Sequence, residues 1–163
     1  MIDLSFTLPA SDVLNQNWIS TALFCPAKLR NGMRWRFMQA KTKLQTIAQT
    51  YLDTEKPAPF EAGKKIKETF TVTAPCMVKK FDPVNFHPTE KVIVDVLVKG
   101  GVLEDDNGLV IPSVVFKSGG SRGKYYEFRL EMEEDASTTP MPLFPDGVGA
   151  KKASLFSEGS DAQ

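Results

Sequence analysis

Strict alternation of apolar and polar side chains marks two segments at opposite ends of the first 135 residues. In Ile2 to Leu8 the even-numbered positions are apolar and the odd-numbered ones are polar, and Pro9 follows. Tyr125 to Met132 alternates in the same way. A period of two is typical of a β-strand with one buried face. We therefore expect a chain that folds around a sheet, with a strand near its start and a closing strand over 125–132.

The residues between these strands predict two helices and at least one further strand. Met33 to Tyr51 contains neither Gly nor Pro and has apolar residues at helical spacing, so it predicts a helix. Residues 10–33, with Pro26 and Gly32, predict a loop with at most a short helical turn. The β-branched segment 66–78 predicts a strand with a bulge or edge position at Pro75. A second helix is expected after Pro88, with Thr89 as candidate cap, and is expected to end at Gly100-Gly101.

The remaining segments complete a small α+β domain. Residues 109–117 are a candidate strand, and the Gly/Ser-rich residues 118–123 predict a turn. The order β-α-β-α-β predicts a mixed sheet packed by two main helices over residues 1–135. Residues 136–163 lack periodicity and are expected to form an acidic, flexible, disordered tail.

Charge is distributed unevenly, although the 20 basic and 20 acidic residues cancel. From residue 131 onward the chain has seven acidic residues and two lysines, a net charge of −5. Residues 1–130 therefore carry a net charge of +5. We expect the acidic end to aid solubility, with binding to the basic residues of the same chain as the alternative. No acid lies between Asp12 and Asp53, where the chain instead carries six basic residues and the aromatic residues Trp18, Trp35 and Phe37. This combination is typical of a phosphate-binding face and also of an ordinary solvated helix. The six basic residues are Lys28, Arg30, Arg34, Arg36, Lys41 and Lys43.

Composition excludes several classes of protein. No apolar run approaches the ~18 residues of a membrane span, and the first residues lack the basic start of a secretory signal. Two cysteines give neither a disulfide framework nor metal-ligand spacing. The single histidine, His87, excludes any mechanism that needs two. We expect a soluble, cytoplasmic protein with no membrane partner.

Acidic residues between Phe81 and Asn107 are the strongest candidates for chemistry. Asp82 is expected to end a strand, Asp95 shares a helix face with Lys91 at i,i+4 spacing, and Asp105-Asp106 follow the helix. Carboxylates brought together from three elements would repel one another unless a cation such as Mg²⁺ neutralised them. The same residues are also typical of ordinary turns and of a surface ion pair.

The string from Asp82 to Asn107 resembles the RusA family of Holliday-junction resolvases, small endonucleases frequent in phages and prophages. The family pattern has an Asp and an Asn at a strand end, a helix with Lys and Asp, a small-residue turn, and then Asp-Asp. The matching residues are Asp82, Asn85, Lys91, Asp95, Leu97, Gly101, Val102-Leu103 and Asp105-Asp106.

The resemblance implies a homodimeric, Mg²⁺-dependent endodeoxyribonuclease, with Mn²⁺ as a possible substitute, that cuts four-way junctions in DNA recombination and repair. It assigns metal binding to Asp82 with Asp105 or Asp106, an essential role to Lys91, and a place near the site to Asp95. Asn85 and the six basic residues are expected to contact DNA. If phage-encoded, the protein would act in the bacterial cytoplasm.

One departure from the family pattern concerns catalysis. Many members have a second aspartate at the strand end, where this chain has Val84. The alternative prediction is therefore a protein that binds junctions or single-stranded DNA and cuts them poorly or not at all.

Overall fold

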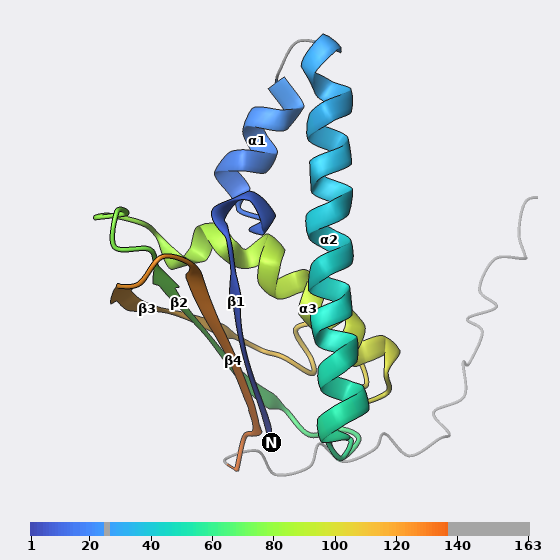
Figure 1. Ribbon diagram of the computed structural model, residues 1–163. Helices are drawn as coiled ribbons and strands as arrows, with labels where there is room; N and C mark the ends of the chain where they lie inside the picture. The colour runs from blue at the N-terminus through green and yellow to red at the C-terminus, as the bar shows by residue number, and fades with distance from the viewer. Residues whose placement is uncertain (25–26, 137–163) are drawn as a thin grey trace, which may run out of the picture.

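A computed structural model of the chain describes residues 1–24 and 27–136, with only the backbone described within 21–30. The described helices and strands follow one another along the chain as shown in Figure 1. They are β1 (Ile2–Leu8), η1 (Ala10–Asp12), α1 (Gln16–Phe24), α2 (Ala27–Glu55), β2 (Ile66–Ala74), η2 (Pro83–Phe86), α3 (His87–Lys99), β3 (Val114–Ser121) and β4 (Tyr126–Glu134).

Four strands form one mixed sheet in the order β1-β4-β2-β3. Strand β4 pairs antiparallel with both β1 and β2, whereas β2 and β3 run parallel. Parallel neighbours need a crossover connection, and α3 supplies it. The predicted α+β class with a mixed sheet is confirmed, and both alternating segments are strands.

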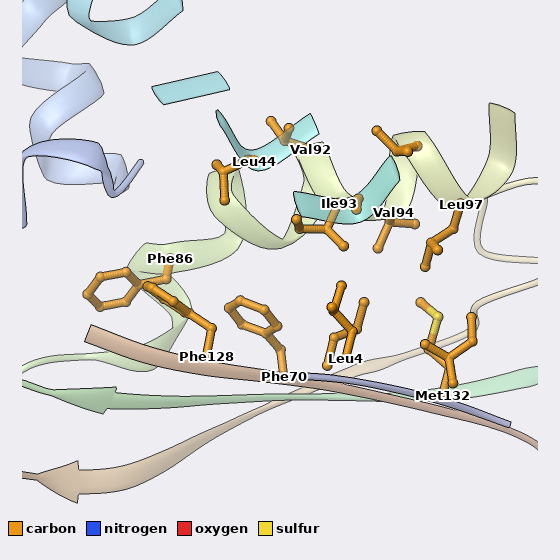
Figure 2. Packing of buried hydrophobic residues seen from close by; sticks show 14 of the residues in the cluster. Leu4, Leu44, Phe70, Phe86, Val92, Ile93, Val94, Leu97, Phe128 and Met132 are labelled. Atoms are coloured by element: carbon orange, nitrogen blue, oxygen red, sulfur yellow. The ribbon is translucent and has the colours of Figure 1, made fainter. Parts of the chain in front are cut away.

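Helix α3 lies between the sheet and α2, which explains why it is apolar on more than one side. Figure 2 shows Ile93, Val94 and Leu97 directed toward the sheet, and Val92 beside Leu44 of α2. All of these side chains are buried, and they face buried sheet residues that include Leu4, Phe70, Phe128, Leu130 and Met132. The hydrophobic effect thus fixes α3 over the centre of the sheet.

The predicted loop over 10–33 was wrong, because most of this segment is helical. It contains η1, α1 and the first turns of α2, which begins at residue 27 rather than 33. Gly32 is tolerated inside α2, where it is exposed and nothing would crowd an added Cβ atom. Figure 1 shows α1 and the N-terminal half of α2 extending beyond the sheet. We call residues 16–24 and 27–39 the α1–α2 arm.

Three other boundaries differ from those predicted. The strand expected over 66–78 ends at Ala74, and the one expected over 109–117 covers Val114–Ser121, which includes part of the predicted turn. Helix α3 begins at His87, so Thr89 does not cap it. The Thr89 hydroxyl instead donates to the Leu14 carbonyl (2.6 Å) and accepts from the Leu14 N–H (3.1 Å).

Within the described part of the chain, no helix combines the length and apolar character required to cross a bilayer. The predicted tail lies outside the described residues, apart from residue 136.

Candidate functional site

Lys91 brings two of the predicted aspartates together. Its ammonium group lies 3.4 Å from Asp95, one turn further along α3, and also contacts the carboxylate of Asp106. Helical spacing explains the first pair, and the turn after α3 returns Asp106 to the helix for the second. Because both aspartates contact one nitrogen, their carboxylates lie near each other.

The adjacent Asp105 and Asp106 have different roles in the turn. The Asp105 carboxylate accepts hydrogen bonds from the Asp106 N–H (2.7 Å) and from Nδ2 of Asn107 (2.5 Å). Asn107 Oδ1 in turn accepts from the N–H of Leu109 (2.8 Å). Asp105 therefore shapes the turn and is exposed, whereas Asp106 is half-buried and directed toward Lys91.

Asp82 does not end a strand, contrary to the sequence-based expectation. Strand β2 ends at Ala74, and Asp82 is the N-cap of η2, where its side chain accepts a hydrogen bond from the Val84 N–H (3.1 Å). Asp82 is exposed and forms no ion pair within the described residues. Asn85 lies in η2, half-buried, three residues after Asp82.

A buried pair of glutamates, which sequence analysis missed, lies beneath the first turns of α3. Glu68, on β2, has no exposed surface, and Glu90, on α3, is 3% exposed. Oε2 of Glu90 lies 2.7 Å from Nδ1 of His87. Neither side-chain oxygen of Glu68 has a hydrogen-bond partner within the described residues.

The surroundings of the two glutamates favour their neutral forms. Burial, together with the negative charge of Glu90, raises the pKa of Glu68 to about 9. Burial also raises the pKa of Glu90, to about 7, against the opposing effect of the positive charge of Lys91. Since the two carboxyl groups interact, they titrate as a pair.

A pocket of about 260 Å³ connects the glutamates with the lysine and aspartate above them. It lies where α3, β2, β3 and the returning turn meet. Its lining consists of Glu68, His87, Glu90, Lys91, Val94, Asp106, Ile111 and Val114. The sequence contained a signal for this site, because Glu68 falls in phase with the apolar positions Ile66 and Phe70 of its strand.

The predicted DNA-contacting residues on α2 differ in exposure. Arg34 and Arg36 are exposed and form no ion pair within the described residues, whereas Lys43 pairs with Asp12. Lys41 is half-buried, and the side chains of Lys28 and Arg30 lie outside the described part of the structure. Of the aromatic residues, Trp35 is 63% exposed, whereas Trp18 stacks on Phe37.

The described residues contain no group of three or more His, Cys, Asp and Glu side chains positioned to hold a metal ion. The predicted ligands Asp82, Asp105 and Asp106 are thus not gathered into such a group. Mg²⁺ retains several waters and requires only one or two protein carboxylates, so a site that includes Asp106 still fits the ion's ligand chemistry.

No protein-family model matches the chain, and no curated protein matches it.

Proposed function

We propose that this chain is a Mg²⁺-dependent, structure-selective endodeoxyribonuclease that cuts branched DNA such as a four-way junction. The observation that carries the proposal is the convergence of Asp95 and Asp106 on Lys91, with Lys91 and Asp106 lining a pocket. These are three of the five residues assigned to catalysis from the sequence. An isolated surface ion pair would not require the turn after α3 to return to the helix.

Lys91 suits the stabilisation of the negative charge that develops on a phosphate under attack. Its ammonium group can exchange a contact with Asp106 for one with a phosphate oxygen at the pocket mouth. Of the predicted ligands, Asp106 would hold Mg²⁺ together with retained waters and substrate phosphate. The bound ion would supply Lewis acidity and lower the pKa of a coordinated water.

The α1–α2 arm supplies a surface for the rest of the DNA. Arg34 and Arg36 are exposed there and form no ion pair with any acid of the described part of the chain, and Trp35 between them is available to stack on an unpaired base. The two hydrogen bonds between Leu14 and Thr89 connect the base of the arm to the helix that carries Lys91. DNA held by the arm would therefore be held in a fixed relation to the site.

A homodimer is part of the proposal because a four-way junction has two strands to cut at symmetry-related positions. A two-fold symmetric pair of chains would present one site to each strand. Paired nicks are the expected product.

The second candidate function is binding of junctions or single-stranded DNA without cutting. The observation that favours it is the environment of Asp82. Val84, which is 52% exposed, has no side-chain atom that could bind a metal ion. The N–H group of Val84 donates a hydrogen bond to the Asp82 carboxylate. This candidate retains the DNA surface of the arm and omits the metal.

The test is a cleavage assay on a labelled four-way junction with Mg²⁺, with Mn²⁺ and with EDTA, alongside a linear duplex of the same sequence. We expect symmetric, metal-dependent nicks in the junction and none in the duplex. Asp106→Asn should abolish cleavage and leave binding unchanged or tighter, because it removes a charge that repels phosphate. The matched control Asp53→Asn, on the exposed surface of α2, should cut at the parental rate.

Junction binding with no cleavage under either metal would favour the second candidate. A chain that neither binds nor cuts the junction would contradict both candidate functions.

A further inference from the structure

Glu68 lies in an environment that an ionised carboxylate cannot occupy alone. It lies on β2, between β3 and β4, with no exposed surface and with both oxygens unpartnered within the described residues. Burying an unpaired charge costs several kcal/mol, so buried carboxylates in folded proteins are neutralised or coordinated. A cation or a proton must therefore accompany Glu68.

Glu90 increases this requirement rather than relieving it. Both carboxyl groups line the same pocket, and the negative charge of Glu90 raises the pKa of Glu68. Two ionised carboxylates are both acceptors and form no hydrogen bond with each other, so a proton or a metal cation must accompany the pair. The ammonium group of Lys91 already contacts Asp95 and Asp106, and Nδ1 of His87 lies 2.7 Å from Oε2 of Glu90.

The pocket beside the glutamates has room for a hydrated ion. Its volume of about 260 Å³ exceeds the ~30 Å³ that one water occupies in the liquid several times over. Besides the two glutamates, the lining consists of the polar side chains of His87, Lys91 and Asp106 and the apolar side chains of Val94, Ile111 and Val114.

We propose that this pocket binds one hydrated divalent cation, Mg²⁺ or Mn²⁺, through the carboxylates of Glu68 and Glu90. Two hard oxygen ligands and several retained waters are the coordination that Mg²⁺ accepts in proteins. The contact from His87 orients the Glu90 carboxyl group, as hydrogen bonds to metal ligands commonly do. The site differs from the predicted set Asp82, Asp105 and Asp106 and goes beyond the proposed function, because it requires neither DNA nor cleavage.

The test is a titration of the full-length, DNA-free chain with Mn²⁺, followed by electron paramagnetic resonance of the free ion. We expect one ion per chain, and a thermal unfolding temperature that rises with Mn²⁺ concentration. Glu68→Gln and Glu90→Gln should each weaken binding by at least about tenfold and abolish the rise in unfolding temperature. Glu133→Gln, the same change on an exposed strand position, should bind as the parent does.

Measurements in EDTA show whether a variant fails to bind Mn²⁺ because it has lost a ligand or because it is less stable. In EDTA, Glu68→Gln should unfold at the parental temperature or higher, because glutamine is neutral without binding a proton and preserves the shape of the side chain. Loss of Mn²⁺ binding in a chain of unchanged stability then reports the ligand itself.

Three results would overturn the proposal: no Mn²⁺ binding by the parent, parental affinity in both glutamine variants, or binding that depends on Asp82 and not on Glu68 or Glu90. If the parent does not bind Mn²⁺ and the Glu68→Gln variant is more stable than the parent, a shared proton neutralises the glutamate pair. The outcome is independent of the cleavage assay. If the chain binds Mn²⁺ at this site but does not cut junctions, the metal site is supported and the nuclease function is contradicted.

Discussion

Lys91 is positioned for a role other than stability. Its side chain is 44% exposed, and that of Asp95 is 37% exposed. Solvent screening at such positions limits each ion pair to about 0–1 kcal/mol. Three charged groups held together for so little stabilisation suggest that the arrangement serves a bound phosphate.

Lys91→Met should therefore separate activity from stability. We expect junction cleavage under single-turnover conditions to fall about 10²–10³-fold, since the positive charge that opposes the developing negative charge is lost. The free energy of unfolding should change by less than about 1 kcal/mol. Lys99→Met, two turns along the same helix face, should leave cleavage unchanged. Equal rates for both variants would exclude Lys91 from the reaction.

The glutamate pair gives the metal-free protein a stability that falls as pH rises. The pKa of Glu68 is raised to about 9 and that of Glu90 to about 7 in the folded chain, so each holds a proton there that the unfolded chain has already released. Their contribution is complete below pH 4.5, the ordinary pKa of a glutamate, and is lost as pH rises toward the folded pKa values. The slope is at most about 1.4 kcal/mol per pH unit for each group.

Urea unfolding in EDTA at several pH values between about 5 and 8 measures this slope. Glu68→Gln should flatten it, whereas Glu133→Gln should not. A slope that is the same in the parent and in Glu68→Gln would contradict the assigned pKa values.

Individual site residues were predictable where local spacing determines the contact. The Lys91–Asp95 pair follows from i,i+4 spacing alone and is confirmed. The contact between Lys91 and Asp106 depends on how the turn after α3 returns, which spacing does not determine. Glu68 was missed because glutamate is ordinarily exposed, although its phase with Ile66 and Phe70 placed it on the buried face.

At the scale of elements, prediction succeeded where one face of a segment is buried and failed where breakers were given too much weight. β1 and β4 alternate because each has one face on the core. Residues 27–32 at the start of α2 were missed because Pro26 and Gly32 suggested a loop. Pro26 immediately precedes the helix, and an exposed glycine costs a helix of 29 residues only about 1 kcal/mol.

The α1–α2 arm should supply a measurable part of the salt dependence of DNA binding. Replacing Arg34 and Arg36 together with alanine should weaken junction binding and reduce the slope of log affinity against log salt by about 2, because two phosphate contacts are lost. Lys64→Ala with Lys67→Ala removes the same charge from residues that pair with Glu61 and Glu133, and should change the slope less. Fluorescence anisotropy over a salt series measures both. An unchanged slope in the arginine variant would place the DNA surface elsewhere.

At the scale of the whole molecule, the structure places most of the acidic residues near the C-terminus in the folded part of the chain rather than in the predicted tail. Four of the seven acids counted from residue 131 onward lie at 131–135, at the end of β4 and directly after it. Two of these have basic neighbours on the sheet, since Glu131 pairs with Arg129 (3.2 Å) and Glu133 with Lys67 (3.6 Å). Residues 137–163 contain only three acids and two lysines, a net charge of −1. The exposed arginines of the arm and the acids at the end of β4 therefore belong to the same folded unit.

Deletion of residues 137–163 tests whether the segment competes with DNA for the arm. Because the deletion changes the net charge by only one unit, we expect affinity for a four-way junction to change by less than about threefold. Anisotropy titrations of the full chain and the shortened chain at two salt concentrations measure this, with Glu131→Gln as a variant that removes one charge from the folded part. A gain of about tenfold or more on deletion, lost at high salt, would instead assign the segment the role of an electrostatic competitor.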